Sequence, residues 1–192
     1  MKVVRLCGLV GLLGILGGCA TSAATQADKI IDAPYGSAAE NQNADDLALK
    51  HKLQDGLDGA FKGSDIRVVV SAGSVLLVGQ TRSEVLKSQA TLQVKRVASV
   101  KQVYNYLTLS AMPSLNSSSA ISQQVSERIA KQQDVIAENV QVITVDGVVY
   151  LMGTNVGNLS AINVAIQGAY GIEKVNKVVN LIQKGDQDYY TR

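Results

Sequence analysis

The sequence is poor in the side chains on which most enzymes and metal centres depend. Its 192 residues include one histidine, His51, two cysteines, one phenylalanine and no tryptophan. His51 lies in a stretch rich in Lys and Asp, which favours a solvent-facing residue over a general base. The chain shows no Cys/His spacing typical of a metal site and no glycine-rich phosphate loop. We therefore expect a non-enzymatic protein that uses no cofactor and no metal.

Net charge is also scarce. The chain holds 18 Lys+Arg against 16 Asp+Glu, and two of the cations, Lys2 and Arg5, stand at the N-terminus. Loss of that terminus would leave a formal net charge of zero, so strong nonspecific attraction to nucleic acid is not expected. With so few aromatic residues, stacking platforms for bases are few as well. We therefore exclude nucleic acid as a partner.

The first 18 residues are typical of a signal peptide. Lys2 and Arg5 precede the uncharged apolar run Leu6–Leu16, which is too short to cross a bilayer core of about 30 Å. The ending Leu16-Gly17-Gly18-Cys19 resembles the lipobox of bacterial lipoproteins. We expect residues 1–18 to be removed and Cys19 to carry acyl chains such as palmitate. A short membrane anchor and an ordinary secretory peptide are the alternatives.

Lipidation of Cys19 would have two consequences. Cys7 lies in the removed segment, so the mature chain would keep one acylated cysteine and could form no internal disulfide. Several acyl chains on one residue anchor firmly, because each buried methylene contributes roughly 0.8 kcal/mol. In bacterial lipoproteins an Asp after the cysteine favours the inner membrane. This chain has Ala20, so the resemblance implies the outer membrane.

Beyond Cys19 the sequence alternates between polar segments and two similar stretches. Residues 19–44 lack any helical or strand period and predict a flexible tether, and residues 185–192 form a short polar tail. Residues 45–112 and 117–184, called copy one and copy two from here on, repeat one another around a break with Pro113 and a serine run. Each copy is near the lower size limit for a stable domain, so we expect the copies to pack together.

The repeat is visible in two pairs of segments. Ile66–Gly79 matches Val140–Gly153, and Val100–Leu109 matches Ile172–Leu181. Apolar residues three or four apart predict helices, and apolar residues at alternate positions predict strands. Each copy therefore predicts the order helix, strand, strand, helix, strand, in an α+β fold with a small three-stranded mixed sheet covered by two helices. The helix stripes are Leu49, Leu53, Leu57 and Phe61; Leu86, Ala90, Val94 and Val97; Ile121, Val125 and Ile129; and Ile162, Ala165, Ile166 and Ala169.

Glycines mark the hairpin of each copy. Asp146-Gly147 is a strong signal for a two-residue turn, in which both central residues need positive φ, whereas Ala72-Gly73 is a weaker one. Gly79 and Gly153 end the second strands, where we expect a side chain to obstruct the turn into the helix. Ser118 or Ser119 is a plausible N-cap for the first helix of copy two.

The glycine pattern carries a family resemblance. Gly73-x-Val75-x-Leu77-x-Gly79 and Gly147-x-Val149-x-Leu151-x-Gly153, each followed by a helix and a Val-x-x-Val strand, resemble BON domains. Two such domains behind a lipobox resemble the dual-BON outer-membrane lipoproteins of Gram-negative bacteria. The resemblance implies a lipid-anchored protein on the periplasmic face that binds phospholipid, most of all anionic phospholipid, and maintains membrane integrity under stress. The alternative is a scaffold that contacts an outer-membrane assembly machine.

The same resemblance points to a lipid-binding element, the first helix of the second domain. Here that helix covers about residues 119–133, and its apolar stripe has the period expected for core residues. Contact with lipid would therefore come from the polar positions Gln124, Arg128 and Lys131. The helix has no aromatic residue, and Ala120 stands at its head.

Two further surfaces are candidates for partners. Copy one has an excess of cations, and Arg82, Lys87, Lys95, Arg96 and Lys101 form a candidate basic patch for anionic lipid or an acidic protein, although an ordinary solvated face is the favoured alternative. Gly147–Ile172 contains no charge. An exposed helix without charged side chains indicates an interface. Packing on copy one is our first expectation, and self-association or membrane contact are the alternatives.

Overall fold

The computed structural model describes residues 44–184, which form two three-stranded sheets and four α-helices. Cys19, the signal-peptide-like segment, the tether before residue 44 and the tail from residue 185 lie outside the described residues. Copy one contains α1 (Ala44–Ala60), β1 (Asp65–Ser71), β2 (Ser74–Thr81), α2 (Glu84–Lys95) and β3 (Gln102–Leu109). Copy two contains α3 (Ser119–Ala130), the short 3-10 helix η2 (Ala137–Asn139), β4 (Val140–Val145), β5 (Val148–Thr154), α4 (Leu159–Ala169) and β6 (Lys177–Gln183). The predicted order of helices and strands is confirmed in both copies.

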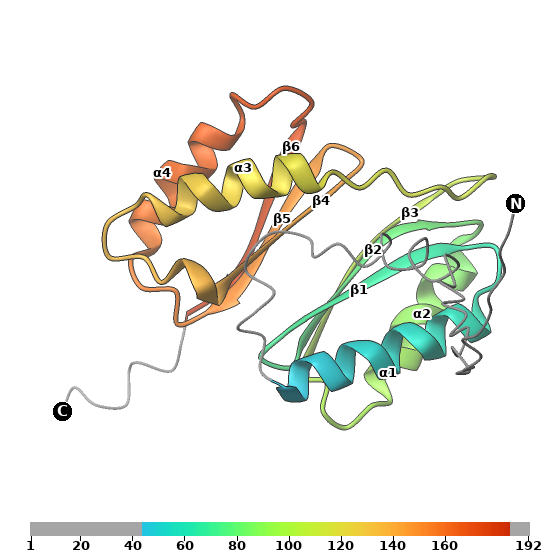
Figure 1. Ribbon diagram of the computed structural model, residues 1–192. Helices are drawn as coiled ribbons and strands as arrows, with labels where there is room; N and C mark the ends of the chain where they lie inside the picture. Colours follow the sequence, from blue (N-terminus) through green and yellow to red (C-terminus); the bar gives the residue numbers. More distant parts are fainter. Residues whose placement is uncertain (1–43, 185–192) are drawn as a thin grey trace, which may run out of the picture. The chain divides into compact units, whose positions relative to one another are not determined.

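Each sheet is mixed, as predicted. The central strand pairs antiparallel with the strand before it and parallel with the strand after α2 or α4, giving the orders β1-β2-β3 and β4-β5-β6. The crossover helix and the first helix of each copy cover one face of its sheet (Figure 1). Leu49, Leu53 and Leu57 of α1 are buried against the first sheet, and Ile121, Val125 and Ile129 of α3 against the second, so the predicted helix stripes belong to the core.

The other faces of the two sheets pack against each other. One apolar cluster contains Leu76 and Val78 of copy one together with Ile143, Tyr150 and Met152 of copy two. Polar side chains bridge the same junction: Gln141 Nε2 donates to the Val70 carbonyl at 3.0 Å. Within residues 44–184 the helix pairs therefore form the outer layers and the sheets the inner ones. The expected packing of one copy on the other is present.

The segment between the copies is held along most of its length. The N–H of Ser114 donates to Gln80 Oε1 at 3.2 Å, and that of Leu115 donates to Asp65 Oδ2 at 2.9 Å. Asn116 then pairs with the β4–β5 turn, since its N–H donates to Asp146 Oδ1 at 3.3 Å and its carbonyl accepts from the Asp146 N–H at 2.9 Å. Side chains from both copies thus fix the path from β3 to α3.

The sequence match of Val100–Leu109 with Ile172–Leu181, which contain the third strands of the copies, was wrong by three residues. In the sheets Val103 pairs with Val75 and Val178 pairs with Val149, so Val178 is the counterpart of Val103. The matching asparagines agree: Asn105 Oδ1 accepts from the Leu107 N–H and Asn180 Oδ1 accepts from the Ile182 N–H, both at 3.0 Å. The error arose because valines recur at three-residue spacing before and inside both strands, so apolar matching alone could not fix the register.

Candidate functional site

The outward face of α3 carries the three polar residues predicted to contact lipid. Gln124, Arg128 and Lys131 are exposed, while Val125 and Ile129 are buried. Spacings of four and three residues place the three side chains on one side of the helix. α3 begins where predicted, because the Ser118 hydroxyl accepts from the Ile121 N–H at 3.3 Å and caps the helix. This outward face is called the α3 stripe.

Arg128 ties the α3 stripe to α4. Its Nη1 donates to the Gly168 carbonyl at 2.7 Å. A cation is favourable there, because the last carbonyls of a helix carry partial negative charge. Copy one contains the reverse arrangement: Gln93 of α2 donates to the Gly56 carbonyl of α1 at 2.9 Å. In each copy a glycine on one helix makes room for a polar side chain of the other, so Arg128 is both a fixed surface cation and a link between two helices.

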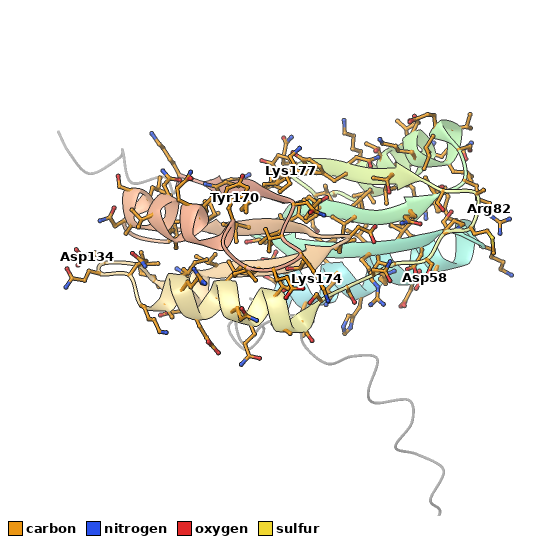
Figure 2. The ribbon with its side chains drawn as sticks, turned by 90° about the horizontal axis from the view of Figure 1, so that it is seen from above. Asp58, Arg82, Asp134, Tyr170, Lys174 and Lys177 are labelled. Carbon is orange, nitrogen blue, oxygen red and sulfur yellow. The ribbon has the colours of Figure 1, made fainter. Side chains whose placement is uncertain are left out.

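α4 adds an uncharged surface beside this cation. It exposes Val164 by 64% and, at its C-cap, Tyr170 by 49%. The Gly168 carbonyl that accepts from Arg128 also accepts from the Gly171 N–H at 3.2 Å, so the guanidinium lies at the turn that carries Tyr170. Figure 2 shows Tyr170 at the end of α4. An aromatic residue, absent from α3, thus comes from α4, and Tyr170 escaped prediction because it follows the end of a helical stripe.

The expectation that the uncharged segment Gly147–Ile172 packs on copy one was only partly right. Tyr150 and Met152 of β5 pack on copy one in the cluster between the sheets. The helix does not take part: Ile162 and Ala165 of α4 pack in the core of copy two. Because α4 covers its own sheet from outside, its polar and apolar outer positions remain exposed.

The five cations of the candidate basic patch do not form one patch. Arg82, labelled in Figure 2, follows the end of β2. Its guanidinium lies over Gly63, whereas the Lys101 side chain lies over Gly73, just before β2 begins. A strand of eight residues separates these places, which is about 23 Å at the usual rise of a β-strand. Lys87 is half-buried, and Lys95 and Arg96 are exposed at the C-terminal end of α2. This placement favours the ordinary solvated face over a single patch, because cations that are close along the sequence need not be close in space.

Two features are absent from residues 44–184. No helix there is long and apolar enough to span a membrane. No group of three or more His, Cys, Asp and Glu side chains in the same residues could hold a metal ion.

The two copies of the duplicated fold match a known domain family. The model of the BON domain matches residues 45–111 and 117–185. The chain belongs to the BON-domain family. Its two BON domains coincide with the two copies, and each has the α+β fold expected from the sequence.

Relatives of the chain include a named lipoprotein. The outer membrane lipoprotein DolP of Haemophilus influenzae is 32% identical over 145 residues, which cover 72% of this chain and 74% of DolP. This similarity supports an outer-membrane lipoprotein of the BON family and is consistent with a non-enzymatic role. An uncharacterized protein of Anaplasma centrale is 34% identical over 115 residues, covering 57% of this chain and 75% of that protein.

A solved structure matches more weakly. CdsD, a structural protein of the type III secretion system of Chlamydia trachomatis, is 18% identical and covers 74% of this chain and 66% of its own, with a TM-score of 0.28. At this TM-score the likeness supports no conclusion about function.

The glycines of the BON motif act through close backbone contacts. A Cβ on Gly79 would overlap the carbonyl oxygen of Asp65 on β1, and one on Gly153 would overlap that of Asn139 just before β4. The expected obstruction is therefore real, but it comes from the neighbouring chain segment and not from the turn into the helix. Gly79 also has φ of 114°, a conformation that favours glycine.

The hairpin glycines Gly73 and Gly147 have φ of 78° and 75°, and both turns are of the same kind, since Ala72 and Asp146 also have positive φ. Ala72 adopts this conformation although alanine disfavours it. Its N–H donates to Asp46 Oδ2 at 2.6 Å, and the Gly73 N–H donates to Asp46 Oδ1 at 3.0 Å. A carboxylate of α1 thus stabilises the weaker turn, a role of Asp46 that the sequence does not reveal.

Proposed function

We propose that this chain is an outer-membrane lipoprotein, held by acyl chains on Cys19 at the periplasmic face, that binds anionic phospholipid through copy two and helps maintain membrane integrity. The observation that carries the proposal is the surface formed by α3 and α4. Cations at Arg128 and Lys131 stand on α3, and the uncharged face of α4 adds exposed Val164 and Tyr170. Cations beside an apolar and an aromatic side chain are the chemistry that an anionic bilayer surface recognises.

The contacts of Arg128 support this assignment. Its hydrogen bond to Gly168 holds one nitrogen of the guanidinium, at 2.7 Å. A guanidinium has five N–H donors, so others remain for phosphate oxygens. Tyrosine prefers the level of the lipid headgroups, where its ring is in apolar surroundings and its hydroxyl meets water. Arg128 and Tyr170 together would therefore meet a headgroup and the layer just below it.

The surface carries few opposing charges. Glu127 is the one acidic residue of α3, and its Oε1 accepts from Gln123 Nε2 at 3.1 Å. It lies four residues before Lys131, on the same side of the helix. α4 contains no charged residue. Two cations near a membrane surface contribute only about 1 kcal/mol each. Binding by the folded part alone is therefore expected to be weak, and the acyl chains on Cys19 would provide the permanent attachment.

Vesicle pelleting tests lipid binding without the anchor. The Cys19→Ala variant, which cannot be acylated, is mixed with vesicles of zwitterionic phospholipid or with vesicles that also contain anionic phospholipid. We expect a folded protein in the soluble fraction of cells that sediments with the anionic vesicles and far less with the zwitterionic ones. Sedimentation with neither kind of vesicle contradicts lipid binding. Continued fractionation of the variant with cell membranes contradicts the role given to Cys19.

The alternative, a scaffold for an outer-membrane assembly machine, was motivated by the basic residues of copy one and by the uncharged segment of copy two. The separation of Arg82 from Lys101 weakens the first motive, and the packing of Tyr150 and Met152 between the sheets accounts for part of the second. Capture of a discrete outer-membrane protein by a crosslinker at Asn163 or Lys95 would favour the scaffold.

A further inference from the structure

The outer face of α2 carries two exposed apolar side chains. Val85 is 64% exposed and Leu92 is 57% exposed. Seven residues apart, they lie on the same side of the helix. The corresponding positions of α4, three strands and one helix later, are the polar residues Ser160 and Gln167. The apolar pair is thus a property of α2 and not of the BON fold.

Opposite charges frame this pair on one flank. Glu84 stands in the first turn of α2 and Lys95 in its last turn, and both are exposed. Eleven residues are close to three full turns, so the two side chains lie on the same flank of the helix. Small or uncharged side chains, Ser88 and Gln89, occupy the middle of the exposed face.

We propose that α2 pairs with α2 of a second copy of this chain, antiparallel, about a two-fold axis that passes near Ser88 and Gln89. In such a pair the surface must be complementary to itself. Val85 and Leu92 are equally far from the point between Ser88 and Gln89 where the axis passes, so each packs on the other type in the second copy. Lys95 of the second copy lies two residues, or about 3 Å along the helix, from the point opposite Glu84, which its long side chain can span, and the same ion pair forms again on the other side of the axis.

The surroundings of α2 permit this pairing. Arg82 is a cation near the acidic end of α2 that would oppose Lys95 of the second copy, but its guanidinium lies over Gly63, between α1 and β1. α2 belongs to the outer layer of copy one, whereas α3 and α4 cover the sheet of copy two. Pairing through α2 therefore leaves the α3 stripe and Tyr170 free.

The contact is small. A helix of 12 residues is about 18 Å long, and a single helix pair buries less than the roughly 1,200 Å² of stable interfaces. The pair is therefore weak in solution, and it becomes populated when both chains are held on one membrane, where their effective concentration is high. This last step rests on the anchor at Cys19 given under the proposed function.

Cysteine crosslinking in the full, lipid-anchored chain tests the pairing. Gln89→Cys puts a thiol next to the two-fold axis, and the other cysteine of the mature chain, Cys19, would be acylated. Mild oxidation of isolated membranes should convert most of this variant into a disulfide-linked dimer. Val164→Cys is the matched control, because it places an exposed thiol at the corresponding position of α4, and it should stay mainly monomeric.

A second change separates pairing from random collision. Adding Leu92→Glu to Gln89→Cys puts a carboxylate into the apolar contact and should lower dimer formation at least about fivefold, because an unpaired buried charge is costly. Leu92 is exposed, so thermal unfolding should be unchanged. Absence of dimers for Gln89→Cys, equal dimers for Val164→Cys, or dimers unaffected by Leu92→Glu contradicts the pairing. If one of these results is obtained while vesicle binding is intact, the pairing fails and the proposed function stands. If vesicle binding alone is lost, the proposed function fails and the pairing stands.

Discussion

Gln54 and Ser126 hold the same position in the first helix of the two BON domains, and only Gln54 completes the edge of its sheet. Gln54 Nε2 donates to the Ile66 carbonyl at 2.8 Å, and its Oε1 accepts from the Val68 N–H at 3.0 Å. Ser126 is too short to make the matching pair of bonds in copy two. Its hydroxyl oxygen is buried and has no hydrogen-bond partner among residues 44–184. The two copies therefore share a fold but differ in how well one buried polar position is satisfied.

This difference predicts opposite effects of two truncations. Gln54→Ser leaves two backbone groups of β1 without their partners and should lower the free energy of unfolding by about 1–3 kcal/mol. Ser126→Ala removes a buried oxygen that gains nothing and introduces a better helix former, so the free energy of unfolding should stay level or rise by up to about 1 kcal/mol. Urea unfolding of both variants, followed by circular dichroism, measures the changes. Equal losses in the two variants would be inconsistent with the assigned roles.

The glycines of the BON motif predict large losses of stability at two positions and a gain at a third. Gly79→Ala and Gly153→Ala force a Cβ into the carbonyl oxygens of Asp65 and Asn139, so each should lower the free energy of unfolding by about 3 kcal/mol or more. Gly59→Ala is the control. A Cβ there meets nothing within 4 Å and the residue lies in α1, so it should raise stability by about 0.5–1 kcal/mol. Thermal melts of the three variants measure these changes. A Gly79→Ala protein as stable as the parent chain would contradict the close approach of Gly79 to the Asp65 carbonyl oxygen.

Much of the fold could be predicted because apolar spacing determines which residues enter the core. Leu49, Leu53 and Leu57 recur at helical spacing, and all three are buried. Register could not be predicted in the same way, since a valine pattern fits a strand at more than one shift, and Val175 was taken for Val178. Contacts between distant segments were also hidden. Nothing in the sequence tells that Asp46 stabilises the Ala72-Gly73 turn.

The candidate site was predictable on α3 and not on α4. Gln124, Arg128 and Lys131 follow from the helix period once the apolar stripe is assigned to the core. Tyr170 follows α4 in sequence, and only the bond from Arg128 to Gly168 shows that it stands beside Arg128.

Tyr150 predicts how stability depends on pH. Burial between the two sheets, together with smaller effects of the neighbouring Tyr106 and Asp146, raises its pKa from 10.0 to about 12. The Tyr106 ring meets it edge to face at 5.3 Å between centroids. The folded state therefore keeps the phenol proton to a higher pH than the unfolded state does. The contribution of the Tyr150 proton to the free energy of unfolding is fully present below pH 10. It is lost as the pH rises from 10 toward 12, which lowers the free energy of unfolding by at most about 2 kcal/mol.

Tyr150→Phe isolates this contribution, because it keeps the ring and removes the proton. Urea unfolding at pH 8 and at pH 11 should show a smaller loss of stability in this variant than in the parent chain. Tyr170→Phe, at an exposed position, should leave the pH dependence of the parent unchanged. The same loss in Tyr150→Phe as in the parent would exclude Tyr150 as the source.

Ala120 offers a gain-of-function test of the α3 stripe. It is exposed at the start of α3, four residues before Gln124, and so lies on the same side of the helix. Ala120→Trp would give the stripe an aromatic side chain suited to the lipid interface and should raise the affinity of the Cys19→Ala protein for anionic vesicles several-fold, by about 1 kcal/mol. The blue shift of tryptophan fluorescence reports the contact directly, since the natural chain has no tryptophan. Unchanged emission in the presence of anionic vesicles would mean that α3 faces away from the bilayer.

Two matched double variants, one on α3 and one on α2, test most directly the central claim that α3 and α4 bind lipid. In the Cys19→Ala chain, Gln124→Glu with Lys131→Glu changes the α3 stripe, and Gln89→Glu with Lys95→Glu makes the same change of charge on α2; all four residues are exposed. The measurement is the fraction of each protein that sediments with anionic vesicles. The account predicts at least about a tenfold loss of affinity for the α3 variant, since three unit charges are altered at the contact, and little loss for the α2 variant. Equal losses, or a loss confined to the α2 variant, would contradict lipid binding by α3 and α4.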